Sequence, residues 1–183
     1  MRAAAHVPLD NPYDVAQLLA VLRRAGAAGQ FTELADRAAA HVPLDNPYDV
    51  AILLTALREV DAEEQATALL HRDPAAHVSL DDPAAVAWLL DSLREAGAQE
   101  QATALADRAA SHVPLHSRHA VDKLLDSLRE AGAKEQAAAL ADQLPGAGMF
   151  ELFRKQEGHQ DEFWFGREAD ASPAEPWGWE DLD

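Results

Sequence analysis

The chain has 183 residues, a formal net charge of −17 and no cysteine. Nucleic acids and anionic membranes both attract cationic protein surfaces, so this acidic chain is expected to bind neither. The absence of cysteine excludes disulfides, thiolate catalysis and cysteine-ligated metal sites. The N-terminal residues lack the apolar segment of a signal peptide, and no apolar run is long enough to span a membrane. We therefore expect a soluble, cytoplasmic protein.

A tandem repeat organises most of the sequence. The fifteen residues 2–16 recur unchanged at 37–51. Four related tetrapeptides, HVPL or HVSL, lie 35, 36 and 35 residues apart and begin at His6, His41, His77 and His112. The one additional residue lies near Asp73 and Pro74. These spacings indicate units that start near residues 10, 45, 81 and 116, within an array over residues 1–145.

Each unit carries the signals of a first helix. A capping residue opens it, followed by proline in three of the units, at Asn11-Pro12, Asn46-Pro47, Asp82-Pro83 and Ser117-Arg118. A valine and three leucines follow at i, i+3, i+4 and i+7, as in Val15, Leu18, Leu19 and Leu22, which places them on one stripe of a helix. Three units then have an Ala-Gly stop signal, whereas the second unit has Val60-Asp61.

A second helix is predicted after each stop signal, as in residues 99–111. Its inward face is mostly alanine with one leucine per unit, which allows close approach of a neighbouring helix: Leu34, Leu69, Leu105 and Leu140. The valine before Pro43 or Pro114 is disfavoured in helical conformation, so the second helix is expected to end there.

One such unit has too small a core to fold alone and must bury its apolar face on its neighbours. We therefore predict an all-α protein, a short right-handed α-solenoid of about four helical hairpins with an aromatic C-terminal cap. A globule resembling a four-helix bundle is the alternative, because so few units could close on themselves. Residues 2–6 match the end of a second helix without its beginning, so we expect the chain to be a fragment of a longer array.

The unit resembles tetratricopeptide and pentatricopeptide repeats. Residues 89–105, LLDSLREAGAQEQATAL, are similar to the helix–Gly–helix core of the latter, and the resemblance covers about residues 2–142. It implies a superhelix whose first helices line a concave surface that binds peptides or proteins in one family and RNA in the other. The base-reading position of the RNA binders is occupied here by Gln17, Ile52, Trp88 and Lys123, so RNA binding is not carried over. The units also resemble Ala-rich tandem repeats of uncharacterised bacterial proteins.

The helix positions opposite the leucine stripe vary between units and are the candidate binding surface. Large apolar residues on a solvent face usually mark a contact site. We predict a groove anchored by Trp88, flanked by Ile52 and the acidic Asp91 and Glu95, which favours a basic or amphipathic segment. The alternative is neutral drift, with Trp88 packed against a neighbouring helix. The candidate residues on this variable face are Tyr13, Gln17, Tyr48, Ile52, Trp88, Asp91, Glu95 and Lys123.

The histidines give only a weak indication of a metal site. Adjacent helices lie about 8–10 Å apart, whereas zinc–nitrogen bonds are about 2 Å, so histidines of successive units cannot share an ion. His112, His116 and His119 are closer in sequence and form a weak candidate tetrahedral site. No cofactor is expected. The sequence contains no G-x-S-x-G, phosphate-loop or H-E-x-x-H motif, so we do not expect an enzyme.

The composition changes after Leu144-Pro145-Gly146, and residues 146–183 form an acidic, aromatic tail. A short helix is expected within residues 149–156. Most aromatic rings of the chain gather in this tail: Phe150, Phe153, Phe163, Trp164, Phe165, Trp177 and Trp179. Either they cap the last unit, as solenoids require, or the exposed Trp177 and Trp179 insert into a partner.

Two classes of function follow from this sequence. The first is a protein–protein interaction scaffold that binds a peptide or partner protein on the variable face of the first helices. The second is a structural or regulatory repeat segment of a larger protein, without a dedicated groove. An enzyme is a distant third.

Overall fold

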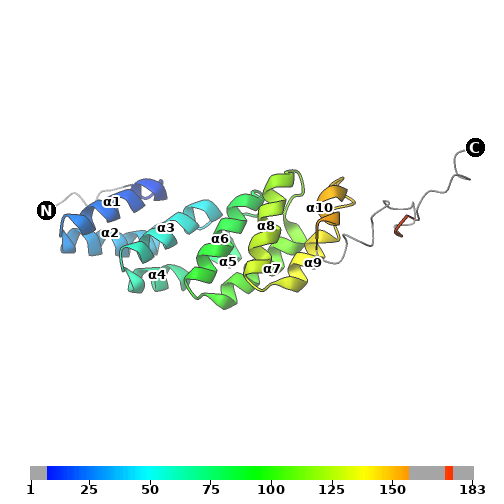
Figure 1. The fold of residues 1–183 in the computed structure, drawn as a ribbon. Coiled ribbons are helices and arrows are strands. Elements are labelled where there is room, and N and C mark those ends of the chain that lie inside the picture. The colour runs from blue at the N-terminus through cyan, green and yellow to red at the C-terminus, as the bar shows by residue number, and fades with distance from the viewer. Residues whose placement is uncertain (1–7, 157–171, 175–183) are drawn as a thin grey trace, which may run out of the picture.

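The computed structural model of the protein describes residues 8–156 and 172–174. These residues form ten α-helices, and Figure 1 shows the helices following one another along an elongated molecule. The prediction of an all-α protein is therefore confirmed for the described part of the chain. No helix in that part is both long enough and apolar enough to cross a bilayer.

The helices alternate between the two types expected from the repeat. The first helices of the units are α1 (Pro12–Arg24), α3 (Pro47–Glu59), α6 (Pro83–Glu95) and α8 (Arg118–Glu130). The second helices are α2 (Ala28–His41), the pair α4 (Glu63–Leu70) and α5 (Pro74–His77), α7 (Gln99–His112) and α9 (Lys134–Ala141). A further short helix, α10 (Phe150–Arg154), follows the last unit.

The predicted start and stop signals act as expected. The side-chain oxygen of Asn11 accepts hydrogen bonds from the amides of Tyr13 and Asp14, which have no carbonyl partner inside the helix. After α6, Gly97 takes the left-handed conformation with φ of 71°, which reverses the chain into α7. In the second unit Asp61 takes this place with φ of 56°, a conformation that non-glycine residues rarely adopt.

The additional residue of the second unit breaks its second helix in two. Asp73 has a φ of 53°, and Pro74 has no amide to donate, so α4 ends at Leu70 and α5 starts at Pro74. The insertion is thus absorbed inside the unit, and α5 still packs against α7.

The units stack in two layers. In the first layer α1 packs on α3, α3 on α6 and α6 on α8, while in the second layer α2 packs on α4, α5 on α7 and α7 on α9. The leucine stripes lie between the layers and are fully buried in the second, third and fourth units. In the first unit Leu18 and Leu22 are only partly buried, because among the described residues α1 has a stacked first helix on one side alone.

Arginine side chains join the second unit to the first and the third unit to the second. The Arg72 guanidinium donates to the carbonyls of Ala39 and Val42, at 2.9 and 2.8 Å. Arg108 makes the same contacts one unit later, to the carbonyls of Ala75 and Val78. Carbonyls in the last turn of a helix have no intrahelical partner, so each arginine satisfies acceptors that the preceding unit leaves open.

The start of the C-terminal tail packs against the array. Leu152 and Phe153 of α10 are buried in the same apolar cluster as the leucines of α8 and α9, and Met149 is partly buried there. The expected short helix is thus present. Trp177 and Trp179 lie outside the described residues, as do residues 163–165, so the aromatic cap stays a prediction.

The arginine contacts between units give a test of the stacking. Replacing Arg108 with methionine keeps the aliphatic bulk but leaves the carbonyls of Ala75 and Val78 without donors. We expect the free energy of unfolding, measured with urea, to fall by about 2 kcal/mol. Arg118→Met, at an exposed position in the first turn of α8, is the control and should change it little. Equal losses in the two variants would contradict this role for Arg108.

Candidate functional site

The variable face of the first helices carries exposed aromatic side chains. Tyr13, Tyr48 and Trp88 are 54%, 44% and 40% exposed, and Gln17 and Lys123 are also exposed. These five positions therefore lie at the surface, in agreement with the exposure predicted from helical periodicity. An exposed large aromatic residue in several successive units is a feature of contact surfaces.

The predicted exposure of Ile52 is wrong, since this side chain is only 9% exposed. In the stack α3 packs on α1, on α6 and on α4, so only a narrow strip of its surface remains open. The Ile52 side chain is small enough to be covered by the neighbouring helices. The equivalent Trp88 on α6 is too large to be covered in the same way and protrudes.

Tyr48 and Trp88 form an aromatic pair across two units. Their ring centroids are 4.7 Å apart and the ring planes meet at 73°, an edge-to-face arrangement. Such pairs contribute about 0.5–1.5 kcal/mol beyond the burial of their area. The contact holds the Trp88 ring in a defined position although much of it faces solvent.

A pocket of about 550 Å³ lies next to this pair, between α3, α6 and α8. Its apolar lining comes from Ala84, Ala85 and Ala87, and Trp88 and Tyr48 are also part of the lining. The first two units have tyrosine where the third has Ala84. The pocket thus occurs where the repeat loses a ring, and a comparison of this position between units could have located it from the sequence.

The pocket is strongly acidic. Among the described residues, Lys123 is the one cationic residue in the lining. Four carboxylates also line the pocket: Asp82, Asp91, Asp126 and Glu130. Carboxylates around a partly enclosed space raise the local concentration of cations. Asp91 and Lys123, both predicted on the variable face, line this pocket together with Trp88.

Asp91 has the most unusual environment of these carboxylates. Its Oδ2 accepts a hydrogen bond from the Ser127 hydroxyl at 3.2 Å, while its Oδ1 is buried and has no hydrogen-bond partner among the described residues. Burial raises the pKa of Asp91 above its ordinary value of 3.8, and the carboxylates of Glu130 and Glu95 raise it further. The Ser127 hydrogen bond and the charge of Arg94 act in the opposite direction.

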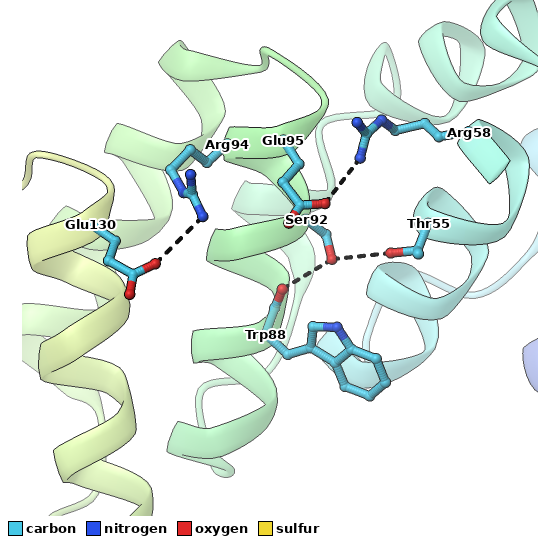
Figure 2. Close-up of polar contacts among 7 residues, drawn as sticks. All are labelled: Thr55, Arg58, Trp88, Ser92, Arg94, Glu95 and Glu130. Atoms are coloured by element: carbon cyan, nitrogen blue, oxygen red, sulfur yellow. Dashed lines mark hydrogen bonds and ion pairs between the residues drawn. The ribbon is translucent and has the colours of Figure 1, made fainter.

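The first helices α6 and α8 meet at the junction between the third and fourth units, where Asp91 lies. The preceding junction, between α3 and α6, shows that stacking does not need a carboxylate at this position. There the hydroxyl groups of Thr55 and Ser92 are 3.4 Å apart, and Ser92 also donates to the Trp88 carbonyl (Figure 2). Thr55 and Ser92 occupy in that junction the places of Asp91 and Ser127. The neutral pair joins the helices without burying a charge, so Asp91 is an acidic substitution at a position where a hydroxyl suffices.

The other predicted residues lie outside this pocket. Glu95 forms an ion pair with Arg58 at 3.2 Å (Figure 2) and lines a separate cavity of about 430 Å³. Tyr13 and Gln17 are on α1, two helices away from α6. Trp177 and Trp179 lie outside the described residues.

The weak candidate metal site is not formed. Within residues 8–156 and 172–174, no three His, Asp or Glu side chains are placed to hold an ion. His112 ends α7, His116 lies in the following loop and His119 is in the first turn of α8, so the three do not converge. The Nδ1 atom of His112 is instead 3.2 Å from the Arg108 carbonyl oxygen.

Comparison with protein-family models, curated proteins and solved structures finds no match to this chain. The resemblance of its units to tetratricopeptide and pentatricopeptide repeats is therefore not supported by a family assignment.

The raised pKa of Asp91 predicts a pH-dependent effect of Asp91→Asn on stability. The Asp91 carboxyl group stays protonated to a higher pH in the folded protein than in the unfolded chain. The contribution of Asp91 to the free energy of unfolding therefore falls as the pH rises from below 3.8 through the raised pKa. The stability of the variant relative to wild type should therefore increase from about pH 3.5 to about pH 7. Urea unfolding at both values checks this, with the exposed Glu59→Gln as control. A difference that is constant with pH would contradict it.

Proposed function

We propose that this chain is a short right-handed α-solenoid that acts as a protein–protein interaction scaffold. A segment of the partner lies along the outer face of the first helices and across the pocket between α3, α6 and α8. The observation that carries this proposal is the exposed Tyr48–Trp88 pair beside that pocket.

The order of the stacked helices supports a solenoid over a closed bundle. Closure would bring the first and last units together, whereas α1 and α8 are not a packed pair in the described part of the chain, and Figure 1 places α3 and α6 between them. An open row leaves the outer face of every first helix accessible to a partner.

The chemistry of the pocket supports a protein ligand. Tyrosine and tryptophan are enriched among the residues that contribute most to protein–protein affinity, because they bury a large rigid surface at low entropic cost. The alanine lining offers an apolar floor, and the surrounding carboxylates favour a basic or amphipathic segment.

Peptide selection tests this function. A random peptide library displayed on phage is selected on the wild-type protein, and affinities of the selected peptides are then measured by fluorescence anisotropy. We expect Tyr48→Ala combined with Trp88→Ala to weaken binding by at least about tenfold. Tyr13→Ala removes an exposed ring of the same face outside the pocket and should weaken affinity less than the double variant does.

A second variant fills the pocket without removing any group. Ala84→Tyr restores the tyrosine of the first two units, whose rings are exposed and compatible with the fold. It should abolish peptide binding while the circular dichroism spectrum is unchanged. If the selected peptides bind all these variants equally, the chain is better described as a structural or regulatory segment of a larger protein.

The tail gives a separate prediction. If the aromatic tail caps the array, the double variant Trp177→Ala, Trp179→Ala should lower the free energy of unfolding by about 3 kcal/mol or more. Thermal and urea unfolding of the full chain measure this. An unchanged stability with lost partner binding would instead indicate a recognition segment.

A further inference from the structure

The pocket between α3, α6 and α8 also indicates which chemical group of a partner it receives. Resting on the function proposed above, we infer that one cationic side chain, lysine or arginine, enters this pocket and places its charge between the Trp88 ring and the Asp91 carboxylate.

The first support is that one carboxylate oxygen of Asp91 has no hydrogen-bond donor among the described residues. Its Oδ1 is buried and, within the described residues, accepts no hydrogen bond, while Ser127 occupies Oδ2 only. Arg94 is on the same helix, but its Nη2 is directed to Glu130 at 3.5 Å, as Figure 2 shows. A carboxylate with one buried oxygen left without a donor is costly to hold charged, and an ammonium or guanidinium group of a ligand in the adjoining pocket would stabilise that charge.

The second support is that the carboxylate is not needed for packing. The junction between the second and third units uses the neutral Thr55–Ser92 pair at the same place. The next junction has Asp91 and Ser127 instead, and it is at this junction that the pocket lies. The acid and the pocket therefore occur together.

The third support is the aromatic wall. The Trp88 ring lines the pocket, and its contact with Tyr48 fixes the angle of its plane. Cations within about 6 Å of an indole face are attracted by the negative potential of the ring. The alanine lining suits the aliphatic stem that precedes the charge in lysine and arginine.

The charge balance completes the support. Four carboxylates and one ammonium line the pocket, and two of the carboxylates, Asp126 and Glu130, are paired with arginines. The lining itself keeps an excess of negative charge, which attracts a cation and repels an acidic side chain. Lys123 is the one cation of this lining, and it is exposed. Its removal should therefore strengthen, and not weaken, the binding of an external cation.

Small model compounds test the inference directly. The probes are Nα-acetyl-lysine-N-methylamide, the corresponding arginine compound and the norleucine compound, which keeps the aliphatic stem of lysine but lacks the charge. Each is titrated into the full chain, and the indole N–H resonance of Trp88 is followed by NMR after assignment with Trp88→Phe. We expect saturable shifts with the lysine or the arginine compound and none with norleucine.

Matched variants then locate the charge. Asp91→Asn should weaken binding of the cationic probe about tenfold. Glu59→Gln removes the same charge at an exposed position outside the pocket and should leave binding unchanged. Lys123→Met should strengthen binding. Circular dichroism confirms that each variant is folded. Equal shifts with norleucine, or an Asp91→Asn variant that binds as tightly as wild type, would overturn the inference.

The same variants separate this inference from the proposed function. Selected peptides that depend on Trp88 but contain no lysine or arginine, or that bind Asp91→Asn as well as wild type, would leave the interaction scaffold standing and overturn the cation subsite. If the cationic probe binds through Asp91 but no selected peptide depends on Trp88, the subsite stands and the scaffold function fails.

Discussion

The packing of each unit against the next is the constraint on which the rest of this structure depends. A unit contributes one stripe of valine and leucine from its first helix and an alanine-rich face from its second helix. In the second, third and fourth units the whole stripe is buried. In the first unit Leu18 and Leu22 remain partly exposed, because among the described residues α1 has a stacked first helix on one side only. The core is therefore a property of neighbouring units, which is the expected behaviour of a repeat protein.

Polar groups repeat with the same period and reinforce this stacking. Arg72 and Arg108 each donate to two backbone carbonyls of the preceding unit. Exposed ion pairs such as Arg58–Glu95 add little free energy, because both charges remain hydrated. The buried stripes and the arginine–carbonyl contacts thus hold the array together, so the outer face of the first helices is free to vary.

That freedom explains how one junction differs from the others. Loss of the tyrosine ring at Ala84 leaves room beside Trp88, and Asp91 stands where the preceding junction has the hydroxyl of Thr55. Each change alone would have a modest effect on the surface. Together they place an apolar floor, an aromatic wall and a carboxylate at one pocket, features that are common in ligand sites.

The sequence by itself determined the features that depend on local chemistry. The cap at Asn11, the left-handed turn at Gly97 and the end of α7 at Val113 follow from the hydrogen-bonding and conformational preferences of a few adjacent residues. The 35-residue period likewise predicted the alternating order of first and second helices, although the second helix of the second unit is divided into α4 and α5. The variation between units also singled out Trp88, Tyr48, Asp91 and Lys123, which line one pocket in the structure.

Only the tertiary structure decided what lies beside each of these residues. Helical periodicity places Ile52 opposite the stripe, but the burial of Ile52 is set by α1 and α6, which cover the flanks of α3. Sequence proximity brought His112, His116 and His119 together, whereas the fold distributes them over a helix end, a loop and a helix start. The open acceptor of Asp91 depends on where Ser127 of the next unit lies. Local preferences shape each helix, but exposure and pocket geometry arise from contacts between units that are distant in the chain.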